Sequence, residues 1–169
     1  MRKTVKVIVS GDGGVGKTSF LNRLVNDIFD ESSELTKGVD FYSKIFYING
    51  IEYNFVMWDF AGQAQFKKIL DEFVDGSFAA FILFDLTRLN TLENVAEWMI
   101  KLKQIGNIPI LLVGTKIDLL DQLENNYLET LVSELKKLHD NVIDFVKISS
   151  KTGYNVKEAF NILIEKISN

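Results

Sequence analysis

The chain has 169 residues and a formal net charge of −4, with 47% hydrophobic and 25% charged residues. This length and composition predict one domain, residues 1–169, that buries most of its apolar surface. The negative net charge argues against nucleic acid as a partner. No apolar run is long enough to span a membrane. The chain has no cysteine, so it has neither disulfides nor thiol metal sites.

The first predicted strand and helix, at 4–9 and 17–26, enclose a glycine-rich loop. The loop, Gly11-Asp12-Gly13-Gly14-Val15-Gly16-Lys17-Thr18, matches the phosphate-binding pattern G-x-x-x-x-G-K-[ST] at every fixed position. In such a loop, backbone N–H groups and a helix N-terminus surround a polyphosphate, the lysine reaches the outer phosphates and the hydroxyl ligates Mg²⁺. We therefore expect a nucleoside polyphosphate to contact Asp12, Gly13, Gly14, Val15, Gly16, Lys17, Thr18 and Ser19.

A polar stretch from Asp30 to Lys37 follows, with few apolar residues to anchor it. Its Thr36 would offer a hydroxyl to Mg²⁺ and an N–H to a γ-phosphate, unless it is an ordinary loop threonine. Strand-like segments at about 40–48 and 51–58 are joined by Asn49-Gly50, a strong hairpin signal, so we expect this pair to be antiparallel.

The hairpin ends in Trp58-Asp59-Phe60-Ala61-Gly62-Gln63. Asp59 would hold a metal-bound water, the Gly62 N–H would approach a terminal phosphate, and Gln63 would orient an attacking water. We therefore predict Thr18, Thr36 and Asp59 as metal ligands, and Lys17, Thr36, Gly62 and Gln63 as catalytic residues.

The rest of the chain alternates strands, predicted at 78–84, 109–114 and 142–148, with helices at 66–75, 91–105, 124–138 and 155–167. Such alternation requires parallel neighbouring strands. The expected fold is α/β: a three-layer P-loop NTPase fold with a six-stranded, mostly parallel sheet, one antiparallel edge strand and helices on both faces.

Two polar motifs at the ends of later strands would select the base. In Thr115-Lys116-Ile117-Asp118, a buried Asp118 carboxylate would accept hydrogen bonds from the N1 and N2 donors of guanine, which adenine lacks. The aliphatic stem of Lys116 would lie along the base. A backbone N–H of Ser149-Ser150-Lys151 would donate to the guanine O6. Taken separately, each motif is equally an ordinary polar loop.

In this order, the motifs resemble those of the small GTPases of the Ras superfamily, most closely the Rab-like branch, over essentially the whole chain. The resemblance implies a molecular switch that binds GTP or GDP with Mg²⁺ and hydrolyses GTP to GDP and phosphate, with Phe29 packed edge-on against the guanine. Segments of about 30–40 and 60–70 would be the switches. Neither contains an arginine, so we expect slow intrinsic turnover and acceleration by a partner's arginine.

The resemblance extends to partner binding. Phe41, Trp58 and Phe73 look like Rab interaction positions, and effector, exchange-factor and activating proteins would bind through the switch segments. Considered without the resemblance, the same three aromatic residues are equally well explained as residues at the edge of the core.

Four residues depart from the family pattern. Thr115 replaces the commoner Asn, and Phe60 replaces a Thr that is typical of Rab proteins. Lys37 replaces the usual Ile, and Ser33 replaces a tyrosine that some relatives have. Rab proteins usually continue into a tail with prenylated cysteines, whereas this sequence stops at its last predicted helix. We therefore expect either a trimmed chain or a relative without a lipid anchor, such as a prokaryotic relative or the GTPase part of a larger protein. The expected protein is a cytoplasmic monomer that reaches membranes only through partners, unless a lipidated tail was removed.

Other functions use the same loop. A nucleotide kinase would need a mobile lid and several arginines, but the chain has few arginines and no spare segment for a lid. A scaffold locked on its nucleotide is disfavoured by Gln63 and Thr36, although Phe60 could impair the catalytic turn. An ATP-specific site would require Asp118 to be incidental.

Overall fold

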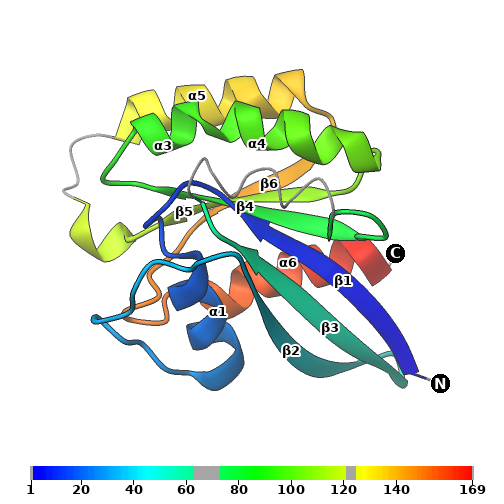
Figure 1. The fold of residues 1–169 in the computed structure, drawn as a ribbon. Helices are drawn as coiled ribbons and strands as arrows, with labels where there is room; N and C mark the ends of the chain where they lie inside the picture. The colour runs from blue at the N-terminus through cyan, green and yellow to red at the C-terminus, as the bar shows by residue number, and fades with distance from the viewer. Residues whose placement is uncertain (1, 63–72, 121–124, 169) are drawn as a thin grey trace.

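The centre of the fold is a six-stranded sheet with the strand order β2-β3-β1-β4-β5-β6 (Figure 1). The computed structural model describes residues 2–62, 73–120 and 125–168. The β2–β3 pair is antiparallel and the other neighbouring pairs are parallel, as the hairpin signal and the alternation predict. The strands are β1 (Arg2–Ser10), β2 (Val39–Ile48), β3 (Ile51–Phe60), β4 (Ala79–Asp85), β5 (Ile110–Thr115) and β6 (Val142–Lys147).

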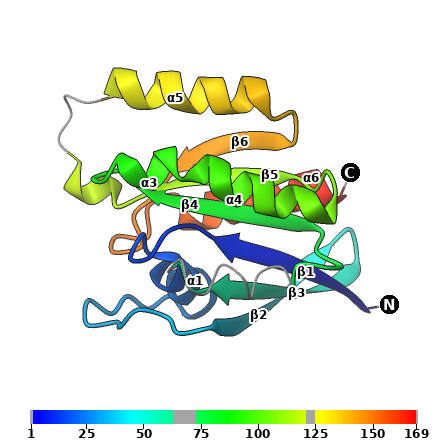
Figure 2. The same ribbon diagram turned by 45° about the horizontal axis from the view of Figure 1, so that its top comes forward.

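Helices cover both faces of the sheet (Figures 1 and 2). On one face lie α1 (Lys17–Asn26) and α6 (Val156–Ser168), and on the other lie α3 (Asn90–Glu93), α4 (Val95–Leu102) and α5 (Asn125–Leu138). Short 3₁₀ turns, η2 (Lys103–Ile105) and η3 (Ile117–Leu119), follow α4 and β5. Within the described ranges, no helix is long and apolar enough to cross a membrane.

The predicted helix at 91–105 is wrong in its continuity, because α3 and α4 are separated at Asn94. The apolar spacing runs on across this break through Leu92, Val95 and Met99, which are all buried, so periodicity gives no sign of it. Most of the predicted helix at 66–75 lies outside the described residues.

Two apolar clusters hold the layers together, one on each face of the sheet. Phe20 of α1, Phe81 of β4 and Phe160 of α6 belong to the first cluster. Phe84 of β4 and Trp98 and Met99 of α4 belong to the second. Strands β4 and β5 are buried along their whole length, as expected for parallel strands covered on both faces. Because the central strands are packed on both faces, they fix the positions at which the loops at their ends begin.

The strand register brings the polar strand ends together. Val9 near the end of β1 pairs with Asp59 of β3, and Asp85 at the end of β4 pairs with Thr115 at the end of β5. Because these strands are parallel, the predicted polar motifs emerge at one edge of the sheet, next to the loop that follows β1.

Candidate functional site

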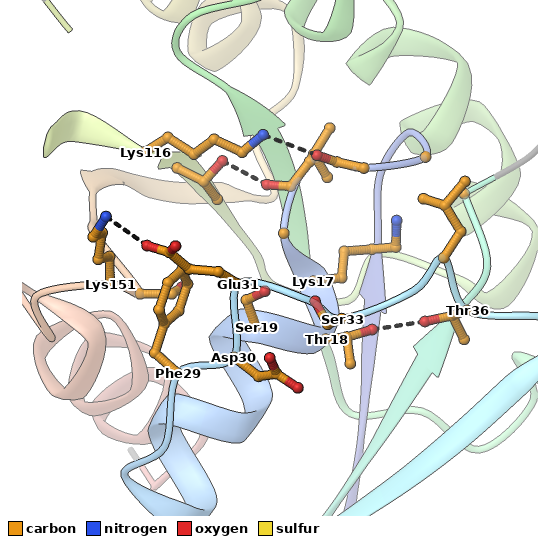
Figure 3. A pocket seen from close by; sticks show the side chains of 18 of the residues that line it. Lys17, Thr18, Ser19, Phe29, Asp30, Glu31, Ser33, Thr36, Lys116 and Lys151 are labelled. Carbon is orange, nitrogen blue, oxygen red and sulfur yellow. Dashed lines mark hydrogen bonds and ion pairs between the residues drawn. The ribbon is translucent and has the colours of Figure 1, made fainter. Parts of the chain in front are cut away.

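A cavity of about 350 Å³ opens at this edge, and Figure 3 shows the side chains around it. Five further residues of the polar stretch, Asp30, Glu31, Ser33, Glu34 and Leu35, also line it, although no motif marks them. Among the predicted site residues, the lining includes Gly13, Gly14, Val15, Gly16, Lys17, Thr18, Ser19, Phe29, Thr36, Gly62, Thr115, Lys116, Asp118, Ser150 and Lys151.

Two glycines of the phosphate loop are required by the backbone. At Gly11 (φ +135°) an added Cβ would lie 2.2 Å from the carbonyl oxygen of Leu83 in β4, which is too close for any side chain. Gly16 (φ +99°) stands immediately before α1 in a left-handed conformation. The chain can therefore pass close to β4 and then enter the helix with its first N–H groups toward the cavity.

Lys17 begins α1 and is almost completely buried. Its Nζ donates to the carbonyl oxygens of Gly11, at 2.8 Å, and Asp12, at 2.7 Å. Burial lowers the pKa of Lys17 to about 8, against the opposing effect of the Asp59 and Asp12 carboxylates. A polyphosphate in the cavity would supply further negative charge to this ammonium group.

Three oxygen-bearing side chains meet beside the lysine. The hydroxyls of Thr18 and Thr36 are 2.6 Å apart, and the Thr18 hydroxyl donates to Asp59 Oδ2 at 2.5 Å (Figure 3 shows the first contact). The other carboxylate oxygen, Asp59 Oδ1, is buried and has no hydrogen-bond partner among the described residues. Burial raises the pKa of Asp59 to about 6, although the hydrogen bond from Thr18 and the charge of Lys17 act in the other direction.

This donor set fits a hard divalent cation. Hydroxyl and carboxylate oxygens are the ligands that Mg²⁺ prefers, and a cation would satisfy the unpaired Oδ1. Within the described part of the chain, no group of three His, Cys, Asp or Glu side chains is arranged to hold a metal. The remaining ligands would therefore come from water and phosphate oxygens, as is usual for Mg²⁺.

The base motif is tied to the phosphate loop. Thr115 Oγ1 donates to the carbonyl oxygen of Val15 at 2.6 Å, and Lys116 Nζ donates to that of Gly14 at 3.1 Å. Lys116 also donates to the buried Asp85 Oδ2 at 2.6 Å. The departure at position 115 therefore keeps a side chain that reaches the loop.

The base end of the cavity is open. Asp118 in η3 is exposed, not buried as predicted, because it stands at the cavity rim. Ser149 is buried outside the lining and accepts the N–H of Thr152 at 3.1 Å, which shapes the turn after β6. Lys151 forms an ion pair with Glu31 at 2.6 Å across the mouth of the cavity (Figure 3).

The sequence matches the family model described as "Ras family" over residues 6–169. The chain belongs to the Ras family. It is 38% identical over 159 residues to the Ras-related protein Rab-36 of Mus musculus, and it is Rab-like within the family. The match covers 92% of this chain and 59% of that relative, so the chain spans well under two thirds of the relative's length. The six-stranded mixed sheet is that of the P-loop GTPase fold.

Asp12 of this Ras-family protein has a different place from the one predicted. Its side chain accepts hydrogen bonds from Asn94 Nδ2 at 2.7 Å and from Trp98 Nε1 at 3.0 Å, so it faces α4 and does not line the cavity. Any contact of Asp12 with a nucleotide would therefore come from its backbone. Asp59 is also outside the lining, behind Thr18, and Gln63 lies outside the described residues.

The three aromatic residues form one contiguous cluster of rings, which we call the aromatic surface (Phe41, Trp58 and Phe73). The ring centroids are 4.6 Å apart for Phe41 and Trp58, and 5.6 Å apart for Trp58 and Phe73. Phe41 is 58% exposed and Phe73 is 39% exposed, which favours an interaction surface over the edge of the core.

Sequence reasoning missed Asp85, which binds two side chains that contact the phosphate loop. Its carboxylate is buried at the end of β4 and accepts hydrogen bonds from Lys116 and Arg88. The available signal was its position, because a polar residue directly after an apolar strand lies at the same edge of the sheet as the other motifs.

Proposed function

We propose that this Ras-family protein is a GTP-hydrolysing molecular switch. It binds GTP and GDP with Mg²⁺ in the cavity and hydrolyses GTP to GDP and phosphate. Segments of about 30–40 and 60–70 signal the nucleotide state to partners. The observation that carries the proposal is that Lys17, the paired hydroxyls of Thr18 and Thr36, and the motif at 115–118 line one cavity, with Asp59 bonded to Thr18 behind the lining.

Mg²⁺ would be held by Thr18 and Thr36, with Asp59 acting through water. The metal supplies positive charge to the phosphates, where negative charge develops during hydrolysis. Support for this assignment comes from the hydroxyl pair and from the unpaired, buried Asp59 Oδ1. Thr36 belongs to the polar stretch and contacts Thr18 at the phosphate end of the cavity, which supports 30–40 as a switch segment.

The residues of the cavity divide between the two ends of the nucleotide. Lys17 and the loop N–H groups bind the phosphates, whereas Asp118 accepts from the guanine N1 and N2 donors and Lys116 lies along the base. Phe29 packs on the base edge, and a backbone N–H near Ser150 donates to O6. Gln63 orients the attacking water, and the Gly62 N–H approaches the γ-phosphate.

Partners act on the switch segments and the aromatic surface. Effector, exchange-factor and activating proteins bind there, and an activating partner brings the arginine that speeds hydrolysis. The aromatic surface supports this role because its rings are contiguous and two of them, Phe41 and Phe73, are exposed.

A change of base preference tests the proposal. Asp118→Asn should weaken GDP binding by at least about 100-fold and favour XDP, because the amide cannot accept from both guanine donors. Affinities for GDP, XDP and ADP are measured by competition against a fluorescent nucleotide, with Asp144→Asn as the control. Asp144 is an exposed carboxylate in β6, away from the cavity, paired with Lys136.

Two results would contradict the proposal. Equal affinity for GDP and ADP in the wild-type chain would remove guanine specificity. Unchanged nucleotide preference in Asp118→Asn would remove the role of this carboxylate. Chromatography of the nucleotide released from the GTP-loaded wild-type chain completes the test: conversion to GDP supports a switch, and persistent GTP supports a locked scaffold.

A further inference from the structure

Arg88 lies against the outer side of the phosphate loop. It follows β4, and its Nη2 donates to the carbonyl oxygen of Gly13 at 3.2 Å while its Nε donates to Asp85 Oδ2 at 3.0 Å. A Cβ built on Gly14 would be 3.6 Å from the same Nη2. Arg88 is not among the residues that line the cavity, so the guanidinium group holds the loop from outside.

The backbone of Arg88 is fixed on both sides. Its N–H donates to the carbonyl oxygen of Asp85 at 2.9 Å, and its own carbonyl oxygen accepts from the Thr91 hydroxyl at 2.7 Å. These contacts place Arg88 in a turn between β4 and α3. The arginine side chain therefore starts from a defined position and has little freedom to lose when it reaches the loop.

Asp85 joins Arg88 to the base motif. Its side chain is only 1% exposed, and the same oxygen accepts from Lys116 at 2.6 Å and from Arg88 at 3.0 Å. Burial opposes the ionisation of Asp85, but the hydrogen bonds from Lys116, Thr87 and Arg88 together hold its pKa below the ordinary value. One ionised carboxylate thus anchors two cations, and each cation binds a loop carbonyl: Lys116 that of Gly14 and Arg88 that of Gly13.

The direction of these carbonyl groups sets the direction of the N–H groups in the loop. In a trans peptide, the C=O of one residue and the N–H of the next point in opposite directions, and the structure contains no cis peptide among the described residues. A Gly13 carbonyl held outward by Arg88 therefore turns the Gly14 N–H toward the cavity. Consecutive glycines can rotate such peptides at little cost, so an outside contact is needed to hold them.

We propose that Arg88 is a positioning residue that holds the phosphate loop in its binding conformation and slows nucleotide release. The inference rests on the proposed nucleotide site and adds a residue that regulates how long the nucleotide stays. An arginine that acts on the reacting phosphate from within the chain is the competing role. The contacts of Arg88 with Asp85 and the outer carbonyl of Gly13 favour positioning.

The test compares release of mant-GDP, a fluorescent GDP derivative, from Mg²⁺-loaded wild-type, Arg88→Ala and Arg88→Lys proteins. Loss of a charged hydrogen bond at a partly exposed site predicts roughly tenfold faster release from Arg88→Ala. Arg88→Lys keeps the charge but not the planar fork that bridges two acceptors, so its release rate should be intermediate. Arg2→Ala is the matched control, because Arg2 pairs with Glu52 at the far end of β1 and should leave release unchanged.

Single-turnover GTP hydrolysis, measured on the same proteins, separates the roles. Hydrolysis within about twofold of the wild-type rate, together with faster release, supports positioning. Unchanged release from Arg88→Ala would overturn the inference and leave the proposed function intact. Unchanged release with strongly slowed hydrolysis would also overturn it, in favour of a catalytic arginine. A wild-type chain that binds no mant-GDP would overturn both the proposed function and the inference.

Discussion

Asp85 illustrates how one residue can join two parts of a site. The phosphate loop and the base motif are far apart in the sequence, and both reach the same carboxylate oxygen through Arg88 and Lys116. Because these partners are charged and Asp85 is buried, removing the carboxylate would leave two cations without their common acceptor. The effect should appear in stability as well as in nucleotide binding.

Asp85→Asn should lower the free energy of unfolding at neutral pH by about 2 kcal/mol, less than for a fully buried pair because both cations are partly exposed. The pKa of Asp85 is lowered in the folded protein, so its stabilisation is complete above the unfolded pKa of about 4 and is lost as the pH falls through the folded pKa. Denaturant unfolding of both proteins between neutral pH and about pH 3 measures this. A difference that does not shrink in acid would contradict the role of the ionised carboxylate.

Single-residue contacts also show what the sequence can and cannot predict. The loop pattern located Lys17, Thr18 and the glycines because their chemistry depends on neighbours in the chain. Asp12 was predicted at the nucleotide, yet its side chain faces α4, because it accepts hydrogen bonds from Asn94 and Trp98. Both partners are more than 80 residues away in the sequence. No local pattern reports such a contact.

At the scale of elements, one aromatic side chain, Phe160, connects α6 to three strands of the sheet. The ring of Phe160 lies 4.7 Å from that of Phe46 in β2 and 5.1 Å from that of Phe55 in β3. It also stacks with Phe81 of β4 at 6.5 Å, and its side chain is 1% exposed. This helix follows the Ser149–Lys151 turn, so its docking supports the base end of the cavity.

Phe160→Ala should lower the free energy of unfolding by about 4 kcal/mol, because the lost contacts leave a cavity among well-packed rings. Phe78→Ala is the matched control: Phe78 is 54% exposed, and its loss should change stability by less than about 0.5 kcal/mol. Equilibrium unfolding in urea measures both variants. Equal effects of the two substitutions would mean that α6 is held by other contacts.

Among the elements, apolar periodicity predicted α1, α5 and α6 to within one residue wherever the structure describes them. It failed at Asn94, where α3 ends before α4 begins without any change in the apolar pattern. That residue donates its side-chain N–H to Asp12, so the break coincides with a tertiary contact. Periodicity reports which face of a helix is buried and carries no information about such a contact.

For the whole molecule, the fold brings the ends of β1, β3, β4 and β5 to one edge, and a bound nucleotide would contact the segments that follow β1, β3, β5 and β6. A ligand that binds only the folded state stabilises the entire domain. The alternating pattern and the Asn49-Gly50 turn were enough to predict this sheet, because connection rules leave few topologies. The ion pairs that Asp85 forms with Arg88 and Lys116 depend on how the folded chain packs, so they could not be predicted from the sequence.

GDP with Mg²⁺, at about 1,000 times its Kd, should stabilise the protein by about 4 kcal/mol and raise the melting temperature by roughly 10 °C. Removing the metal with EDTA should reverse part of the rise in melting temperature, because the unpaired Asp59 Oδ1 would then have no cation near it. Thermal melting followed by circular dichroism measures the effect, with ADP and Mg²⁺ as the control. An equal shift with ADP would contradict guanine selectivity.

The two tryptophans of the chain lie in different places: one contacts the phosphate loop and the other belongs to the aromatic surface. Trp98 is 1% exposed and donates its indole N–H to Asp12 in the phosphate loop, whereas Trp58 is partly exposed and belongs to the aromatic surface. Their emission spectra should therefore differ, with the buried indole emitting at shorter wavelength. If the proposed function holds, the protein carries two optical reporters: Trp98 would report nucleotide exchange at the loop, and Trp58 would report a partner that binds the aromatic surface.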